Sequence, residues 1–288
     1  MISIILPTYN SEKYIFKCIS SVLNQSYKDF EIIVVDNSST DNTVNIIESF
    51  KSEKIKIFNI KNYGNISISR NLGIEKSIGK WIAFIDSDDL WEKEKLEILS
   101  DKFNNYDFIF HDMKIIHNQN KEIDTFRFKI IKNKNLKFIE YLSIKGNPIF
   151  NSSVVVRKNL LNQVDRISED QPSFTTDYFT WLKISLISKS YYYEKKRLGS
   201  YRIHSKNLSS NIKNSYFYLK CVIQFKKHYS SKTKKMITGY FNYLKGIEYL
   251  EEKKFKKSIK CFYKSIVLSD YEIKIKSSLK LLIFPIKV

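Results

Sequence analysis

The chain has 288 residues, enough to bury a full core and to hold one large domain with an appendage. Its 49 Lys and Arg residues against 30 Asp and Glu give a net charge of +19, but no zinc-ligand, helix-turn-helix or RNA-binding pattern accompanies this excess, so nucleic-acid binding is not expected. Three widely spaced cysteines and the lack of a membrane-length apolar stretch exclude a disulfide-stapled scaffold and a protein built of membrane spans.

Apolar strands alternate with amphipathic helices through the first hundred residues. The pattern predicts strands at 2–6, 31–35, 55–60 and 81–85, and helical segments at 14–23, 43–50 and 64–78. Asn10 or Ser11 is expected to cap the first helix, and Gly79 to end the third. Strands that alternate with helices of this length indicate βαβ units and a parallel sheet. We therefore expect an α/β fold in which the polar ends of several strands lie along one edge.

The most informative junction joins the apolar run 81–85 to the sequence Asp86-Ser87-Asp88-Asp89. Carboxylates cannot remain in the apolar core, because an unpaired buried charge is costly. They are expected at the carboxyl edge of the sheet, where open α/β folds bind ligands. Clustered carboxylates suit Mg²⁺ or Mn²⁺ shared with a substrate phosphate. The alternative is a solvated turn followed by a helix, and for Asp89 a helix N-cap is the preferred interpretation.

Further segments extend this pattern in order along the chain. They are 4–10, 20–27, 31–41, 69–74 and 79–89. Together they resemble the nucleotide-sugar half of a family 2 glycosyltransferase with the GT-A fold, a Rossmann-like, mostly parallel sheet flanked by helices. The resemblance is close over 1–100, weaker to about residue 205 and absent beyond. It implies a glycosyltransferase domain over 1–205, with a nucleotide-sugar half (1–100) and an acceptor half (101–205). The spacing of apolar residues after it predicts a basic helical region over 206–288.

The resemblance also implies a donor site for a nucleoside-diphosphate sugar, with UDP as the expected nucleotide. The residues that it places against the nucleotide are Pro7, Thr8, Tyr9, Asn10, Asp36, Arg70, Asp86 and Ser87. Asp36 would accept a hydrogen bond from a uracil-type base, and Asn37 stands where the family often has a second Asp. For Arg70 the alternative is an ion pair on the helix surface.

A divalent cation, Mn²⁺ or Mg²⁺, is the cofactor that the resemblance implies. It assigns Asp88 as the direct ligand, Asp86 as a support of the metal or the ribose, and His204 as a further ligand near the diphosphate. A cation that bridges two phosphates stabilises the charge that develops on the leaving group. For His204 the alternative is a histidine at the surface end of a strand.

An inverting transfer needs a base that takes the proton of the acceptor hydroxyl. The resemblance assigns this role to Asp177, and Thr176 stands where the family usually has Glu. From the residues alone, Asp177 would be interpreted as a stabiliser of a helix N-terminus. The acidic pair Glu169-Asp170 is the second candidate, although Gln171-Pro172 predicts a loop there.

The tail carries most of the charge, because residues 205–288 hold 19 Lys or Arg and 5 Asp or Glu. Apolar spacing between 240 and 266 resembles one tetratricopeptide-type hairpin, and a single unit predicts a packed appendage more than a peptide-binding array. The stretch 279–286 is too short to span a bilayer. It either lies at an anionic membrane surface, aided by lysines, or packs on the hairpin. A composition rich in Lys, Ile and Asn accounts for part of the charge.

The resemblance implies an inverting, metal-dependent glycosyltransferase, and together with the basic tail it implies a glycan or lipid-linked acceptor of the bacterial cell surface. With no signal peptide recognised and no paired cysteine framework, we expect a cytoplasmic enzyme, peripheral on the inner face of the membrane. Two alternatives remain open. A nucleotidyltransferase would need a glycine-rich, Lys-bearing phosphate loop, and 7–11 contains no glycine. An inactive relative that serves as a membrane-docked scaffold would not be expected to keep Asp36, Asp86, Asp88 and Asp177.

Overall fold

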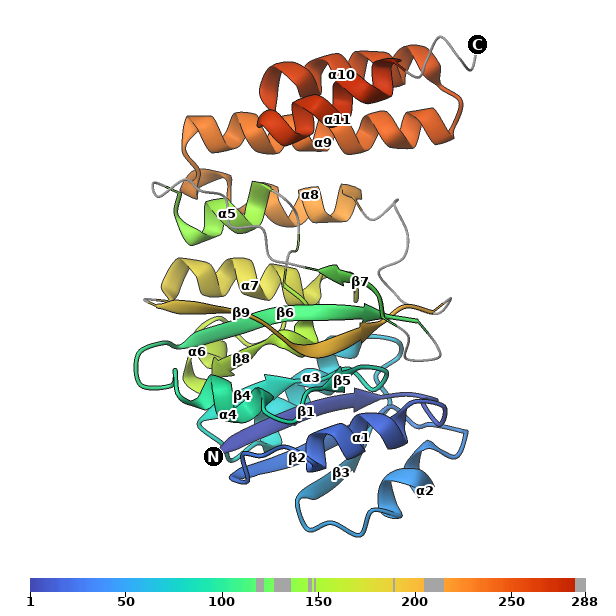
Figure 1. The fold of residues 1–288 in the computed structure, drawn as a ribbon, viewed down its shortest axis with the longest axis vertical. Coiled ribbons are helices and arrows are strands. Elements are labelled where there is room, and N and C mark those ends of the chain that lie inside the picture. The colour runs from blue at the N-terminus through green and yellow to red at the C-terminus, as the bar shows by residue number, and fades with distance from the viewer. Residues whose placement is uncertain are drawn as a thin grey trace. The chain divides into compact units, whose positions relative to one another are not determined.

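The structure, a computed structural model, describes residues 1–117, 122–126, 136–144, 147, 149–188, 190–204 and 215–282. The chain divides into two compact units, one of Met1–Ile130 with Ile149–Asn207 and one of Ile131–Pro148 with Leu208–Val288 (Figure 1). The described residues 136–144, which precede the boundary predicted at residue 205, therefore belong to the second unit.

The first unit is built on one sheet of nine described strands. The strands are β1 (Ile2–Thr8), β2 (Phe30–Asp36), β3 (Ile55–Asn59), β4 (Trp81–Phe84), β5 (Leu90–Trp91), β6 (Phe108–Ile116), β7 (Glu122–Phe126), β8 (Val155–Arg157) and β9 (Tyr191–Arg202). The helices are α1 (Ile15–Leu23), α2 (Thr43–Glu48), α3 (Ile66–Lys76), α4 (Lys95–Ser100), η1 (Asn151–Ser153), α6 (Lys158–Gln163) and α7 (Thr176–Ile187).

The strand order is β3-β2-β1-β4-β8-β6-β9-β5, with β7 paired to β6. β1 is parallel to both β2 and β4, and β2 is parallel to β3, as the alternation of strands and helices predicted. Beyond β4 the sheet is mixed, because β8 is antiparallel to β4 and to β6 while β9 is parallel to β6. The predicted α/β fold is confirmed.

Helices cover both faces of the parallel strands (Figure 1), so β1 and β2 are buried along their whole length. On one face, Ile4 and Leu6 share a core with Cys18 and Ile19 of α1. On the other, Ile5 meets α3 at Gly73, where an added Cβ would lie 2.5 Å from Cγ2 of Ile5. Apolar side chains on both faces explain why these strands are continuous apolar runs.

Two predicted helix boundaries are wrong. The side chains of Asn10 and Ser11 do not cap α1, whose N-cap is Tyr14; the Ser11 hydroxyl is hydrogen bonded to Ser87 instead. α3 begins at Ile66, because the Asn65 side chain accepts a hydrogen bond from Ser67 N, and it ends at Lys76 before the extended Ser77. Gly79 therefore does not end the helix, and its amide donates to the Ser3 hydroxyl.

The second unit is helical, which confirms the predicted appendage. Its elements are α5 (Phe138–Ile144), α8 (Ser215–Gln224), η3 (Lys226–His228), α9 (Ser231–Glu251), α10 (Phe255–Leu268) and α11 (Tyr271–Leu282). The predicted hairpin corresponds to parts of α9 and α10, which approach closely where Ser258 Oγ donates to the carbonyl of Gly246 at 2.6 Å. Of the apolar stretch 279–286, residues 279–282 lie in α11 and the rest lie outside the described residues. In the described part of the chain, no helix is long and apolar enough to cross a membrane.

Candidate functional site

The ends of β1, β2 and β4 meet at one edge of the sheet, as their sequence pattern predicted. Thr8 pairs with Asp36 in register, and Ile5 pairs with Phe84 just before the acidic sequence. Pro7 and Thr8 are buried at the end of β1, whereas the Tyr9 side chain is exposed. Because these strands run parallel, their carboxyl ends present polar side chains to one common surface.

Hydrogen bonds join the loop that follows β1 to the loop that follows β2. Asp36 is buried and accepts hydrogen bonds from the amide of Ser39 at 2.8 Å and from its hydroxyl at 2.5 Å. Asn10 adopts a positive φ of 46°, its main-chain N–H donates to Ser39 Oγ, and its side-chain Oδ1 accepts from Thr40 N. The buried Thr8 hydroxyl has no hydrogen-bond partner. An unpaired buried hydroxyl is costly, so this one is suited to meet a ligand.

Asp86 lies in a set of hydrogen bonds that join distant parts of the chain. Its Oδ1 accepts from Arg70 Nη2 at 2.9 Å and from Asn151 Nδ2 at 3.2 Å, and its amide donates to Ser152 Oγ. The Arg70 side chain is 5% exposed, so the predicted alternative of a surface ion pair is wrong. Its Nε atom and the Oδ1 atom of Asn151 are buried without partners. Unsatisfied buried polar atoms of this kind are uncommon in folded proteins, and here two of them lie next to Asp86.

The structure brings together Asp88 and His204, two of the three predicted metal ligands. Nε2 of His204 lies 2.7 Å from Oδ2 of Asp88, and the two side chains are 13% and 20% exposed. Burial raises the pKa of Asp88, the Asp86 carboxylate raises it further, and the hydrogen bond from His204 opposes both. Among the described residues, no three His, Cys, Asp or Glu side chains converge as a metal-binding group.

Asp89 does not cap a helix, so that interpretation is wrong. The short strand β5 follows it, and α4 begins only at Lys95. Asp89 is 1% exposed and accepts a hydrogen bond from the amide of Arg202 at 3.0 Å. Burial raises the pKa of Asp89 well above its usual value, and the charges of Asp88 and Asp86 raise it further. Asp89 thus holds the end of β9 next to the sheet edge that carries Asp86 and Asp88, which is termed the acidic edge.

Asp177 lies in the first turn of α7, half-buried, and its Oδ1 accepts from the amide of Tyr178 at 2.7 Å. The residue before it, Thr176, is 3.4 Å from Arg70 Nη1 through its Oγ1 atom. This contact connects the start of α7 with the Arg70–Asp86 pair. The competing candidate Glu169 accepts from Asn71 Nδ2 at 2.7 Å, and it lies in a loop as predicted.

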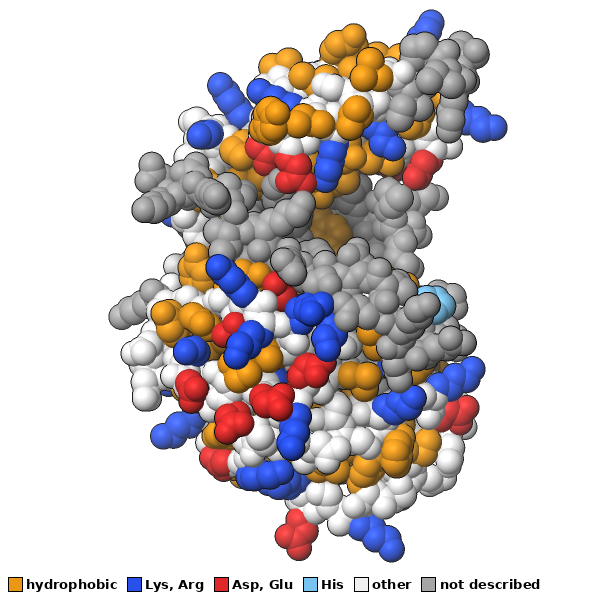
Figure 2. All heavy atoms as spheres, in the orientation of Figure 1, with side chains coloured by type: hydrophobic (Ala, Val, Ile, Leu, Met, Phe, Trp, Pro, Cys, Tyr) orange, Lys and Arg blue, Asp and Glu red, His pale blue; other side chains and the backbone are white. Residues whose placement is uncertain are grey.

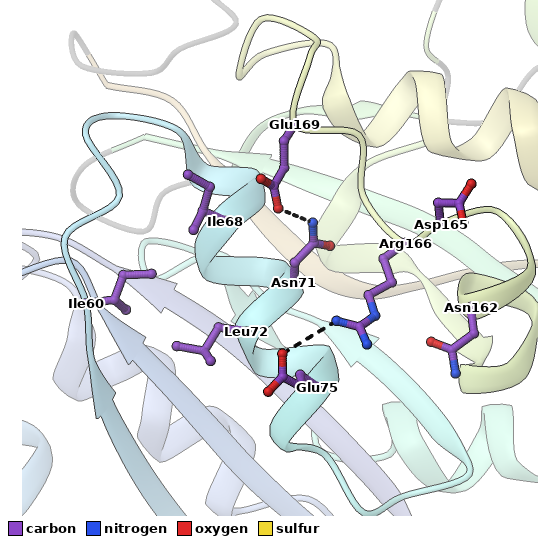
Figure 3. A pocket seen from close by; sticks show the side chains of 9 residues that line it. All are labelled: Ile60, Ile68, Asn71, Leu72, Glu75, Asn162, Asp165, Arg166 and Glu169. Atoms are coloured by element: carbon purple, nitrogen blue, oxygen red, sulfur yellow. Dashed lines mark hydrogen bonds and ion pairs between the residues drawn. The ribbon is translucent and has the colours of Figure 1, made fainter.

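A groove of about 650 Å³ lies beside α3, and Glu169 is in its wall (Figure 3). Its lining residues are Ile60, Ile68, Asn71, Leu72, Glu75, Asn162, Asp165, Arg166 and Glu169. None of the predicted donor-site residues lines it. The groove is therefore separate from the acidic edge, although both contact α3.

Four residues at the acidic edge were missed by the sequence analysis: Ser39, Asn151, Ser152 and Arg202. Ser39 lies within the motif that follows β2, so its position was a usable signal. Asn151 and Ser152 come from η1, 65 and 66 residues from Asp86, and nothing in the sequence spacing marks them. Arg202 donates from Nε to the carbonyl of Asp88 at 2.9 Å, and its position two residues before the predicted ligand His204 was a usable signal.

A family model described as glycosyl transferase family 2 matches residues 3–158. The chain is 33% identical over 219 residues to UDP-Glc:alpha-D-GlcNAc-diphosphoundecaprenol beta-1,3-glucosyltransferase WfgD of Escherichia coli, and the match covers 73% of this chain and 80% of that protein. Other relatives are much longer, and the match covers only 18% of uncharacterized glycosyltransferases of Rickettsia conorii and Rickettsia felis.

Solved structures share the fold, including the following two. The crystal structure of Staphylococcus aureus TarS 1-349 in complex with UDP-GlcNAc has a TM-score of 0.68 and 22% identity, covering 94% of this chain and 82% of that chain. The mannosyltransferase PcManGT of Pyrobaculum calidifontis, in complex with GDP-Man and Mn²⁺, has a TM-score of 0.65 and 12% identity, covering 98% and 80%. At these identities the likeness concerns the fold alone, and it confirms the expected GT-A architecture.

Proposed function

The chain belongs to glycosyl transferase family 2, and we propose that it transfers a sugar from a UDP sugar to a glycan or lipid-linked acceptor in the synthesis of a bacterial surface glycan. The observation that carries this proposal is the convergence of Asp36, the Arg70–Asp86 pair and the Asp88–His204 pair at the edge formed by β1, β2 and β4. A cationic guanidinium and buried polar atoms without partners suit a nucleotide with a charged diphosphate.

The donor set at this edge fits a divalent cation. The pKa of Asp88 is raised by burial and by Asp86, so a positive charge beside this carboxylate would be favourable. Mg²⁺ and Mn²⁺ sites commonly use one or two carboxylates and complete their shell with substrate phosphate oxygens and water, so fewer than three protein ligands suffice. Asp88 and His204 would hold the cation, and Asp86 would support it. When bound, it would stabilise negative charge on the departing diphosphate.

The proposed chemistry is a single displacement with inversion at the sugar. The oxygen of an acceptor hydroxyl forms a bond to the anomeric carbon while the bond from that carbon to the diphosphate oxygen breaks. Asp177 takes the proton of the hydroxyl as this occurs. The contact of Arg70 with Thr176, the residue before Asp177, supports a base positioned in relation to Asp86.

The second unit is proposed to attach the protein to an anionic membrane surface, where a lipid-linked acceptor would be found. Hydrophobic side chains and lysines occur on the same face of this unit (Figure 2). Exposed apolar residues of α10 and α11 are Tyr263, Val267, Tyr271, Ile275, Leu279 and Leu282. Exposed lysines on the same helices include Lys256, Lys260, Lys264 and Lys274. Exposed apolar side chains among lysines suit an interface with anionic headgroups.

A nucleotide-sugar panel tests the proposal. UDP-glucose, UDP-N-acetylglucosamine, UDP-galactose and GDP-mannose would each be mixed with the full chain, with Mn²⁺ or with EDTA, both alone and together with lipid-linked acceptors. Thermal unfolding reports binding, and release of the nucleoside diphosphate reports turnover. We expect one UDP sugar to raise the unfolding temperature and to be turned over with Mn²⁺. Binding without turnover in the presence of lipid-linked acceptors would favour the inactive scaffold, and no binding of any nucleotide sugar would refute the donor site.

A further inference from the structure

Side-chain hydrogen bonds tie α3 to the segment that leads into α7. Asn71 Nδ2 donates to the carbonyl of Ile167 at 2.9 Å and to Glu169 Oε1 at 2.7 Å, while its Oδ1 accepts from the amide of Ile167 at 2.9 Å. Asn65 Nδ2 adds a bond to the carbonyl of Glu169 at 3.0 Å. Asn71 and Ile167 are 96 residues apart, so only the tertiary fold brings them together.

An open groove lies between α3 and the loop that contains Ile167 and Glu169, so apolar packing between them is limited. The hydrogen bonds of Asn65 and Asn71 therefore determine the position of this loop more than apolar packing does. Asn71 and Glu75 on α3 point toward Glu169 and Arg166, which also line the groove (Figure 3). The pair between Arg166 Nη1 and Glu75 Oε2 is 3.7 Å long and well exposed, so it contributes little. The Asn71 side chain bonds both the main-chain N–H and the main-chain carbonyl of Ile167. This double contact fixes both the distance and the orientation of Ile167 relative to α3.

Helix α3 also contacts both the proposed donor site, at Asp86, and the start of α7, which carries the proposed base. Arg70, next to Asn71, pairs with Asp86 at 2.9 Å and approaches Thr176 Oγ1 at 3.4 Å. Thr176 begins α7, and Asp177 follows it. The hydrogen bonds of Asn65 and Asn71 to Ile167 and Glu169, termed the clasp, therefore hold one end of the 167–177 segment. Arg70 approaches the other end.

We propose that Asn71 is a positioning residue for the transfer reaction, which fixes the 167–177 segment, and with it Asp177, in relation to the Arg70–Asp86 pair. This inference rests on the proposed role of Asp177 as the base. Asn71 does not need to touch either substrate. Its loss should therefore reduce turnover while leaving the affinity for the donor nucleotide unchanged.

Asn71→Asp is the sharpest variant, because it preserves the shape of the side chain. An aspartate still accepts from Ile167 N, but it cannot donate to the carbonyl of Ile167, and it places a carboxylate against that of Glu169. Adding Glu169→Gln replaces this repulsion with an amide that can donate to the new carboxylate. Asn162→Ala is the matched control, because Asn162 lines the same groove and its described side chain makes no hydrogen bond to α3.

The four full-length proteins (parent, N71D, N71D/E169Q and N162A) would be compared by steady-state kinetics, by calorimetry with UDP and Mn²⁺, and by hydrogen exchange of the amides in 167–177. We expect N71D to lower kcat by about 10- to 100-fold, the scale of a misplaced catalytic group. The Kd for UDP should stay within about twofold of the parent value, a change of roughly 0.4 kcal/mol. Exchange in 167–177 should accelerate because the segment opens locally. The double variant should recover part of both effects, and N162A should match the parent.

Parent-like kcat and exchange in N71D would overturn the proposal. A loss of kcat in N71D that N71D/E169Q does not partly recover would also overturn it. So would a loss of kcat in N71D that is matched by an equal loss of UDP affinity. Failure of the proposed function gives a different pattern. If the parent turns over no donor, the exchange measurement still decides whether Asn71 holds the segment, and parent-like exchange in N71D would refute the clasp by itself.

Discussion

Nε2 of His204 lies 2.7 Å from Oδ2 of Asp88, although the two residues are 116 positions apart in the sequence. Arg202, two residues before His204, supports this contact by donating to the carbonyl of Asp88, and its amide donates to Asp89. The residues at the end of β9 therefore lie against the acidic residues that follow β4. The edge draws its groups from the ends of β1, β2 and β4, from η1 and from the residues at the end of β9.

Replacing Asp177 with Asn should impair the chemistry more than the binding of the donor. The change preserves shape and removes basicity, so turnover should fall by about 10²–10⁴-fold, the usual contribution of a positioned base. Calorimetry should give an unchanged affinity for UDP. Asp101→Asn, at an exposed carboxylate that ends α4, is the control for the substitution itself. Near-normal turnover of D177N would move the role to Glu169 or Asp170, or to no side chain.

Glu31 should stabilise the sheet in a pH-dependent manner. Burial by itself would raise the pKa of Glu31, but hydrogen bonds from Ile78 N, Lys56 and Ser3 outweigh it and lower the pKa. A lowered pKa means that the stabilisation is present above the unfolded pKa of about 4.3 and is lost as the pH falls through the folded value.

Urea unfolding of the parent and Glu31→Gln measures this effect. We expect the variant to be less stable by about 1–2 kcal/mol at neutral pH, since hydrogen bonds to a charged group are lost. The difference should shrink when the titration is repeated at about pH 3.5, below the unfolded pKa. An equal difference at both pH values would show that the charge of Glu31 does not contribute.

Much of the first unit was predictable because its strands carry a strong local signal. The apolar runs of β1, β2 and β4 have buried positions on both faces, and the polar residues that follow them must leave the core. Parallel pairing then brings Thr8, Asp36 and Asp86 to one edge. Family resemblance, more than periodicity, pointed to Arg70 and His204, whose partners lie 16 and 116 residues away.

The parts that could not be predicted depend on tertiary contacts. Asp89 resembled a helix cap in its local sequence, yet the fold buries it against the amide of Arg202. Ser11 resembled a cap for α1, yet its hydroxyl is hydrogen bonded to Ser87. Asn151 reaches Asp86 from a 3-10 turn that no periodic pattern marks. In each case a distant partner determines the role of a side chain whose local sequence suggests another.

The exposed face of α10 and α11 should bind anionic vesicles through both charge and apolar contact. Val267 and Tyr271 are 75% and 79% exposed, and the exposed Lys264 and Lys274 lie three positions from them along α10 and α11. Exposed charges are screened over about 10 Å at 0.1 M salt, so vesicle binding should weaken steeply as salt rises. Sedimentation with anionic and neutral vesicles measures it.

Matched variants separate the contributions to vesicle binding. Lys256→Gln, Lys260→Gln and Lys264→Gln together should reduce sedimentation with anionic vesicles, and Tyr271→Ser with Ile275→Ser should reduce it further. Lys51→Gln, Lys80→Gln and Lys93→Gln, which remove the same charge from exposed positions of the first unit, are the control. Equal sedimentation with neutral and anionic vesicles, or none with either, would leave the second unit without a membrane role.

Calorimetry of UDP binding with Mn²⁺ or with EDTA, in the parent and in Asp88→Ala, tests the donor site most directly. We expect Mn²⁺ to strengthen UDP binding to the parent by about tenfold or more, equivalent to roughly 1.4 kcal/mol. Because Asp88 and His204 are in contact and Asp86 lies beside them, removing the Asp88 carboxylate should abolish most of this gain while the protein remains folded. Equal UDP affinity with Mn²⁺ and with EDTA in the parent, or an undiminished Mn²⁺ effect in D88A, would contradict a metal-assisted donor site at this edge.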